Sequence, residues 1–169
     1  MNEGALWERV IDGDKEAFGQ LYCLYSTPVR SFVRHYLGDS SAADDLVQET
    51  FLQLWKRPNS FNPERGTLKQ YLFGIARNRA AQWRRETPIS LPAESAEPAI
   101  NNTVELTLLR TALQQLGKDE RALLWLREIE GYSYAELAGI LDIPVGTVKS
   151  RLFSAREALR RVWCKGPEL

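Results

Sequence analysis

A proline-rich stretch at residues 87–102, TPISLPAESAEPAINN, divides a chain that otherwise shows helical periodicity. It holds three prolines and no basic residue, a composition typical of a linker. Apolar residues recur at three- and four-residue spacing on both sides of it, and no segment alternates as a strand would. At 169 residues the chain can bury one good core or two small ones. The sequence therefore predicts an all-α fold in which two small helical domains, residues 1–86 and 103–169, are joined by a flexible linker at 87–102.

Capping residues and glycines mark the ends of the predicted helices. The spacing of a capping box occurs at residues 41–44, Ser-x-x-Asp, and at 133–136, Ser-x-x-Glu. Thr67 can cap a helix that runs to about residue 86. Gly38 and Gly131 stand where apolar periodicity stops, as helix-terminating glycines do.

Charge is unevenly distributed, although the formal net charge is zero. Eight basic residues and one acidic residue lie between positions 56 and 85, and six basic and one acidic between 145 and 165. Two basic zones on a neutral chain suggest two separate phosphate-facing surfaces. Ordinary solvated helix faces give the same pattern, so charge alone does not decide between these interpretations.

Composition argues against several other classes of protein. Two distant cysteines and one histidine exclude a disulfide framework and a Cys/His zinc site within one chain. We find no phosphate-cradling glycine loop and no carboxylate cluster with metal-ligand spacing, so we expect no catalytic residue, metal or cofactor. The chain shows neither a signal peptide nor an apolar run of membrane-spanning length. We therefore expect a cytoplasmic protein that is not inserted in a membrane.

The carboxy-terminal part has the pattern of a helix-turn-helix. A short capped helix and a tight turn at 142–144 precede a helix predicted from about Val145 to Trp163. One face of that last helix is apolar and the opposite face is polar and basic. In a helix-turn-helix such a second helix enters the major groove of DNA. A helical hairpin with a solvated basic face has the same spacing, so the pattern leaves both possibilities open.

The segment GYSYAELAGILDIPVGTVKSRLFSAREALRR, residues 131–161, closely resembles the domain-four helix-turn-helix of bacterial extracytoplasmic-function (ECF) RNA polymerase sigma factors. Its IPVGTVKSRLFSAR core is the most specific part of the resemblance. Ser154 stands where many members of that family carry a basic residue. The resemblance implies that the following residues contact the −35 promoter element: Thr147, Lys149, Ser150, Arg151, Phe153, Ser154 and Arg156.

The helix predicted from Thr67 has an apolar face that includes Tyr71 and Trp83, which we expect in the core. Its other side carries cations with Phe73 among them, a pattern suited to a strand with exposed bases. Arg79 falls on the apolar side, where it could be a buried partner for an acid. Residues 61–85 resemble sigma regions 2.3 and 2.4, which capture the unpaired −10 strand. The resemblance, with the loop at 56–62, implies these −10 contacts: Asn59, Ser60, Phe61, Lys69, Arg77 and Arg84.

Residues 44–55, DDLVQETFLQLW, form an acidic helix in a chain that otherwise looks suited to DNA. Asp44 fits a cap near the positive helix end. A second set of side chains points away from the apolar face and suits a basic protein partner better than DNA: Asp45, Gln48, Glu49 and Leu52. The stretch resembles sigma region 2.2, which implies that this set binds the β′ clamp helices of core RNA polymerase.

The resemblance covers most of the chain outside the linker and implies a sigma domain 2 bundle followed by a sigma domain 4 helix-turn-helix. Such a factor binds core RNA polymerase, at the β′ clamp helices and the β flap, directs it to −10 and −35 elements, and helps to open the promoter DNA. It is not an enzyme, and an anti-sigma factor is an expected partner. A dimeric helix-turn-helix repressor or activator is the alternative, but it leaves the acidic helix unexplained. A nuclease or hydrolase has little support.

Overall fold

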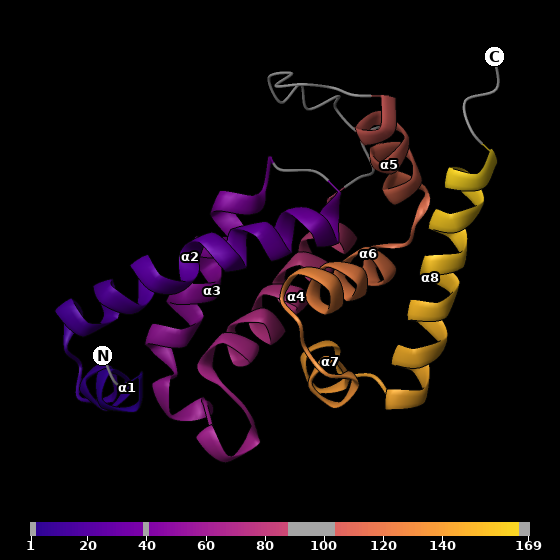
Figure 1. Ribbon diagram of the computed structural model, residues 1–169. Helices are drawn as coiled ribbons and strands as arrows, with labels where there is room; N and C mark the ends of the chain where they lie inside the picture. Colours follow the sequence, from indigo (N-terminus) through magenta and orange to yellow (C-terminus); the bar gives the residue numbers. More distant parts are fainter. Residues whose placement is uncertain (1–2, 39–40, 88–103, 166–169) are drawn as a thin grey trace. The chain divides into compact units, whose positions relative to one another are not determined.

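The computed structural model describes residues 3–38, 41–87 and 104–165, and their secondary structure is helical (Figure 1). The helices form two compact units, the first built on α1 to α4 and the second on α5 to α8. This confirms the prediction of an all-α fold with two small helical domains. Apart from Thr87, the predicted linker at 87–102 lies outside the described residues.

The first unit contains α1 (Glu3–Ile11), most of α2 (Lys15–Leu37), α3 (Ala43–Lys56) and α4 (Leu68–Glu86). Helix α3 packs along α4, and two short 3-10 turns, η1 (Pro58–Ser60) and η2 (Pro63–Arg65), connect them. Apolar side chains from α2, α3 and α4 form the core. Its largest fully buried members are Phe32, Leu21, Leu46, Phe51, Leu54, Leu68, Leu72 and Phe73.

The sequence-based prediction that Phe73 lies on the outer, basic side of its helix was wrong. Phe73 is 0% exposed, and its ring centroid lies 5.1 Å from that of Phe32 on α2. Lys69 Nζ lies 5.7 Å from the same ring. Helix α4 is covered by α2 as well as by α3, so its buried face is wider than the single stripe that periodicity indicates.

Two of the predicted helix starts are confirmed at atomic level. Thr67 Oγ1 accepts a hydrogen bond from the backbone N–H of Gln70 at 3.2 Å, and Gln70 Oε1 accepts one from the N–H of Thr67 at 3.0 Å. Ser133 and Glu136 form the same reciprocal box at the start of α7. Each box satisfies backbone donors that the first turn of a helix leaves unpaired.

The prediction of a capping box at residues 41–44 was also wrong. Helix α3 begins at Ala43, and its N-cap residue is Ala42, which makes no side-chain cap bond. The carboxylate of Asp44 instead accepts a hydrogen bond from Arg30 Nε on α2 at 2.6 Å. Asp44 still stands in the first turn, where the helix dipole favours a carboxylate, but its partner comes from another helix.

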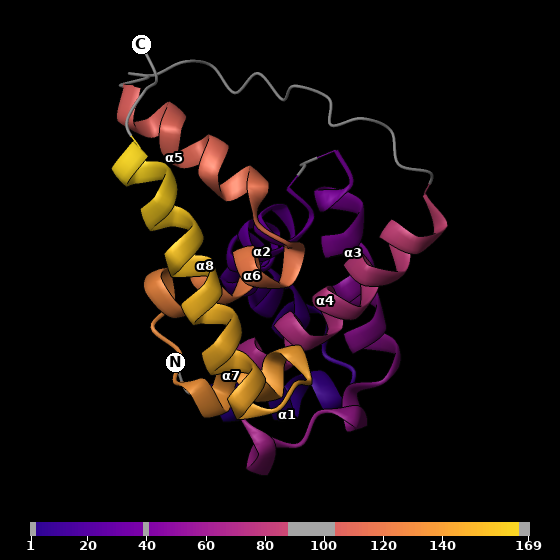
Figure 2. The ribbon, with the colours of Figure 1, turned by 90° about the vertical axis from the view of Figure 1, so that its right-hand side faces the viewer.

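The second unit consists of α5 (Val104–Gln115), α6 (Lys118–Leu124), a π-helical turn η3 (Trp125–Ile129), α7 (Tyr134–Leu141) and α8 (Val145–Lys165). Helix α8 packs against α5, α6 and α7 (Figure 2). Its buried residues Val148, Leu152 and Ala155 recur at four- and three-residue spacing. Asp142 adopts the left-handed conformation, φ 51°, that ends α7 before the turn into α8.

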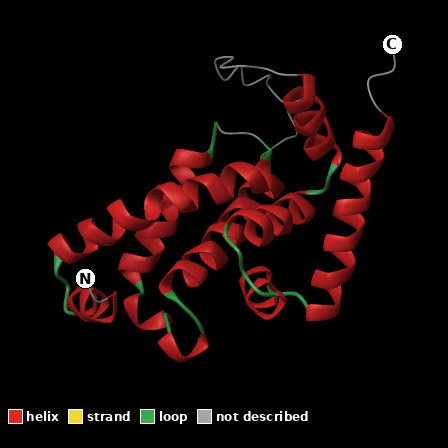
Figure 3. Ribbon diagram, in the orientation of Figure 1, coloured by secondary structure: helices red, strands yellow, loops and turns green. Residues whose placement is uncertain are grey.

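The described elements are all helices (Figure 3). Among the described residues, no helix is both long enough and apolar enough to cross a membrane.

The same substitution at two phenylalanines tests the extended core of α4. Phe73→Ala should lower the free energy of unfolding by about 3–5 kcal/mol, because it leaves a cavity in the core. Phe153→Ala, at a residue that is 67% exposed, should change it by less than about 0.5 kcal/mol. Urea unfolding followed by circular dichroism measures both values. A small effect at both positions would contradict the burial of Phe73.

Candidate nucleic-acid interface

The loop between α3 and α4 is held by hydrogen bonds from its own side chains. Ser60 Oγ donates to the carbonyl of Arg57 at 2.6 Å and lies 2.5 Å from the hydroxyl of Tyr71. Asn62 Oδ1 accepts from the backbone N–H of Glu64 at 2.9 Å and caps η2. The loop therefore presents its outer side chains from a fixed backbone.

The side chain of Phe61 packs against two neighbouring aromatic rings and so helps to hold this loop in place. Its ring lies 5.4 Å from Trp7 of α1, edge to face, and 5.4 Å from Tyr71 of α4. Phe61 and Tyr71 are half-buried, whereas Asn59 and Ser60 are exposed. Of the three loop residues predicted to meet DNA, Phe61 thus has a structural partner on each side.

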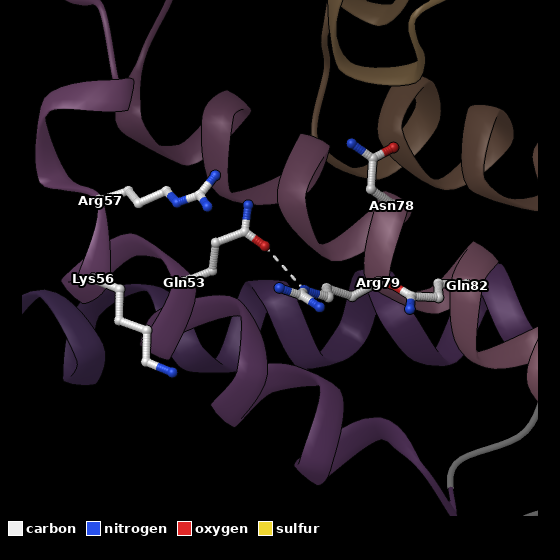
Figure 4. A pocket seen from close by; sticks show the side chains of 6 residues that line it. All are labelled: Gln53, Lys56, Arg57, Asn78, Arg79 and Gln82. Carbon is white, nitrogen blue, oxygen red and sulfur yellow. Dashed lines mark hydrogen bonds between the residues drawn. The ribbon is translucent and has the colours of Figure 1, made fainter.

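A polar cavity lies between the end of α3 and the middle of α4, and its lining side chains are drawn in Figure 4. Its volume is about 380 Å³. Arg79 Nε donates to Gln53 Oε1 at 2.9 Å across it. Among the described residues, three cations, three amides and no carboxylate line the cavity: Gln53, Lys56, Arg57, Asn78, Arg79 and Gln82.

This cavity, which we call the α3–α4 groove, contains residues that sequence reasoning missed. The sequence suggested an acid as one possible partner for Arg79, but its partner is the amide of Gln53, and Arg79 is only half-buried. Asn78 and Gln82 are four residues apart and share one face of α4. The four-residue spacing of these two amides can be seen in the sequence. It indicates a shared binding surface only when α3 is known to pack beside α4.

The three cations predicted along α4 differ in their surroundings. Arg84 is exposed, whereas Lys69 and Arg77 are half-buried. Arg77 Nη1 donates to Asn78 Oδ1 at 3.3 Å. The Nε atom of Arg77 is buried and has no hydrogen-bond partner within the described part of the chain. The structure thus brings Arg77 next to the groove through Asn78.

The acidic side chains of α3 lie where the sequence predicted. Asp45, Gln48 and Glu49 are exposed, and Leu52 is exposed to 52%. The opposite side of the helix is buried through its apolar stripe, including Phe51 and Leu54. We call the four outward residues the acidic face of α3. It occupies the first part of the helix, and the groove residues Gln53 and Lys56 follow it toward the helix end.

The outer side of α8 presents most of the residues predicted to read DNA. Lys149, Ser150, Phe153 and Ser154 are exposed. Thr147 is half-buried, and its carbonyl accepts a hydrogen bond from Ser150 Oγ at 3.1 Å.

Arg151 and Arg156 instead pair with acids on other helices of the same unit. Arg151 Nη1 lies 2.9 Å from Asp119 Oδ2 on α6, and Arg156 Nη2 lies 2.6 Å from Glu128 Oε1 on η3. The hydrogen bond that Arg156 donates to Glu128, with a second to Tyr134, raises the pKa of Arg156 above its usual value. The structure therefore gives a partner within the protein to two of the residues expected to contact DNA.

Comparison with known families identifies both units. Residues 21–87 match the family model described as Sigma-70 region 2. Residues 106–159 match the model described as Sigma-70, region 4. The first match covers α3, the groove and α4, and the second covers the helix-turn-helix.

Named relatives are similar over nearly their whole length. The RNA polymerase sigma-H factor of Pseudomonas aeruginosa is 34% identical, covering 91% of this chain and 90% of the relative. The ECF RNA polymerase sigma-E factor of Salmonella typhimurium is 36% identical, covering 94% and 93%.

Solved structures agree with this comparison. The sigma factor RpoE of Bartonella quintana, in complex with the anti-sigma factor NepR, matches with a TM-score of 0.75 at 28% identity, covering 89% of this chain and 98% of that one. CnrH, in complex with the cytosolic domain of CnrY, matches with a TM-score of 0.73 at 25% identity, covering 96% and 97%. With both sigma regions present in order along one chain, this protein belongs to the ECF family of RNA polymerase sigma factors, the transcription initiation factors that recognise promoters.

Proposed function

We propose that the two units divide promoter recognition between them. Residues 1–86 act as sigma domain 2, which binds core RNA polymerase and the −10 element, and residues 103–169 act as sigma domain 4, which binds the −35 element. The observation that supports this most strongly is the surface of α3, where exposed carboxylates are followed by a groove lined by cations and amides. One helix thus offers surfaces for two partners of opposite charge.

The acidic face of α3 is proposed to bind the β′ clamp helices of core polymerase. Carboxylates repel DNA phosphates, so Asp45 and Glu49 suit a basic protein surface. Leu52 adds an exposed apolar side chain to the same face, as the centre of a protein interface requires. Charge complementarity around it would speed and orient the association.

The α3–α4 groove and the adjoining loop are proposed to hold the unpaired −10 strand. Lys56, Arg57 and Arg79 suit phosphates, whereas the amides of Gln53, Asn78 and Gln82 can pair with base edges. The volume of the groove falls within the range of small-molecule sites. Extruding a base costs a few kcal/mol, which contacts in such a pocket can offset. Asn59 and Ser60, with Lys69, Arg77 and Arg84 along α4, extend this surface.

The outer side of α8 is proposed to enter the major groove at the −35 element. Lys149 can donate to guanine acceptors, Ser150 and Ser154 to bases or phosphates, and Phe153 can contact a thymine methyl group. Thr147 stands at the amino-terminal turn of the helix, beside Ser150. The β flap of the polymerase is the expected protein partner of this domain.

We further propose that an anti-sigma factor restrains this chain and that it acts in the cytoplasm, where RNA polymerase works. Two similar solved structures, RpoE of Bartonella quintana and CnrH, are complexes in which a second protein binds the factor. An exposed acidic and apolar face such as that of α3 would be accessible to such a protein when the polymerase is absent.

Glu49→Arg tests the acidic face. This charge reversal should weaken binding to core polymerase more than tenfold, because like charges across an interface cost several kcal/mol. Co-purification with core and promoter-dependent initiation measure the loss. Glu8→Arg, at an exposed acid of α1, is the matched control and should bind normally. If the wild-type chain neither co-purifies with core nor initiates transcription, a free-standing regulator becomes the better explanation.

Lys56→Ala tests the groove. Holoenzyme carrying it should bind a single-stranded −10 segment more weakly, and its salt dependence, log K against log salt, should become shallower by about 0.7 per lost phosphate contact. Lys15→Ala, at an exposed lysine of α2, is the control. Asn78→Ala should alter base preference with little change in the salt dependence. If Lys15→Ala and Lys56→Ala had equal effects, the groove would not be the strand site.

Lys149→Ala tests the outer side of α8. It should weaken binding to the −35 duplex by removing a groove contact worth about 1–3 kcal/mol, and it should leave core binding intact. Electrophoretic mobility shifts with holoenzyme measure the first quantity and co-purification the second. Arg161→Ala, exposed near the end of α8, is the control. Equal loss of core and −35 binding would point to misfolding.

A further inference from the structure

We infer that Asp119 and Arg151 are a positioning pair: Arg151 fixes the recognition helix α8 on α6 and supports −35 recognition without touching DNA. The inference rests on the proposed function of α8 and assigns to Asp119 a role in specificity. Arg151 is then not itself a DNA contact: it orients the residues of α8 that contact DNA.

The geometry ties both side chains to each other. Arg151 Nη1 lies 2.9 Å from Asp119 Oδ2, and the two side chains are 36% and 26% exposed. Asp119 Oδ1 is buried and has no hydrogen-bond partner in the part of the chain that the structure describes. A carboxylate with one oxygen shut off from water is stabilised by a cation beside it. Arg151 supplies that cation, so turning it toward a phosphate would leave Asp119 uncompensated.

The pair acts where the recognition helix needs its orientation fixed. Leu152, the next residue, is buried, whereas Lys149 and Ser150, two residues and one residue before Arg151, are exposed. Because successive residues of a helix are about 100° apart, a small rotation of α8 would displace both outward side chains from the base edges. Recognition sites require side chains held to within about 0.5 Å.

The second arginine pair on α8 is a weaker candidate for this role. Arg156 and Glu128 are 44% and 54% exposed, and exposed ion pairs contribute little because water screens them. Arg156 can leave Glu128 for a phosphate at small cost. The different burial of the two pairs therefore distinguishes Arg151, which positions the helix, from Arg156, which can turn to bind DNA.

A double-substitution cycle tests the inference with full-length chain assembled into holoenzyme. The probe is a promoter duplex selected from a random pool by wild-type holoenzyme, alongside the same duplex with its −35 segment scrambled. The variants are Arg151→Met, Asp119→Leu and the two combined, since removing both partners of a part-buried pair is less harmful than leaving one of them without its counter-charge. Affinity is measured at a temperature where circular dichroism shows each variant to be folded. Asp119→Asn with Arg151→Gln is a second combined variant, for use if the apolar one does not fold.

Arg151→Met alone should lower the affinity for the −35 duplex about tenfold, a coupling typical of residues that share an ion pair. The combined variant should return to within about threefold of wild type, and the salt dependence should stay unchanged throughout. Lys149→Met is the matched control: it should also lower the affinity for the −35 duplex, because a groove contact is lost, and adding Asp119→Leu should not rescue it.

Two results would overturn the inference. In the first, the combined variant binds no better than Arg151→Met and the salt dependence falls by about 0.9, which shows that Arg151 contacts a phosphate. In the second, all variants bind like wild type once folded, which shows that the pair contributes only to stability. A wild-type holoenzyme that does not prefer the intact −35 duplex would instead refute the proposed function of α8.

Discussion

The packing of α3 against α4 is the constraint on which the surfaces of the first unit depend. Phe51 and Leu54 of α3 are buried in the same core as Leu72 of α4, and this contact fixes the rotation of α3 about its axis. The acidic face then has to point outward, and Gln53 has to approach Arg79 at the other side of the groove. The η1 turn and its loop start directly from the end of α3, so Phe61 can reach Trp7 and Tyr71 only in this arrangement. A core mutation in this contact would therefore affect both proposed partner surfaces at once.

Features that depend on neighbours in the sequence were predictable, and features that depend on distant partners were not. The boxes at Thr67 and Ser133 join residues three apart, so the sequence alone contains both partners. The partners of Asp44, Arg79 and Arg151 lie 14, 26 and 32 residues away. Each of these polar side chains was given a role from its own helix, as a cap, an acid's partner or a DNA contact, and each has a partner on a different helix. The fold class and the acidic face needed no such information, because an apolar stripe at helical spacing fixes which residues face outward.

The candidate site shows the same division. The resemblance to sigma factors assigned general roles to the loop and to α8, and the exposed positions of Asn59, Lys149 and Phe153 are compatible with them. The groove could not be predicted because amides carry no charge pattern and its lining comes from two helices. Periodicity also misplaced Phe73, since it assumes one buried face whereas α4 packs against two neighbours. Resemblance therefore indicated where to look, and tertiary packing determined which side chains are available.

The order of charges along α3 is compatible with the two partners proposed for this helix, a basic protein surface and a DNA strand. Asp44 and Asp45 lie in the first turn and Lys56 in the last, the order that the helix dipole favours. From Asp45 to Lys56 the helix rises about 16 Å at ~1.5 Å per residue, roughly twice the Debye length of about 8 Å at physiological salt. The two ends are thus screened from one another, so Asp44 and Asp45 at the start of α3 reduce the attraction of a DNA strand to its end only slightly. The two roles proposed for α3 are therefore compatible with a formal net charge of zero, because local charge rather than total charge sets each contact.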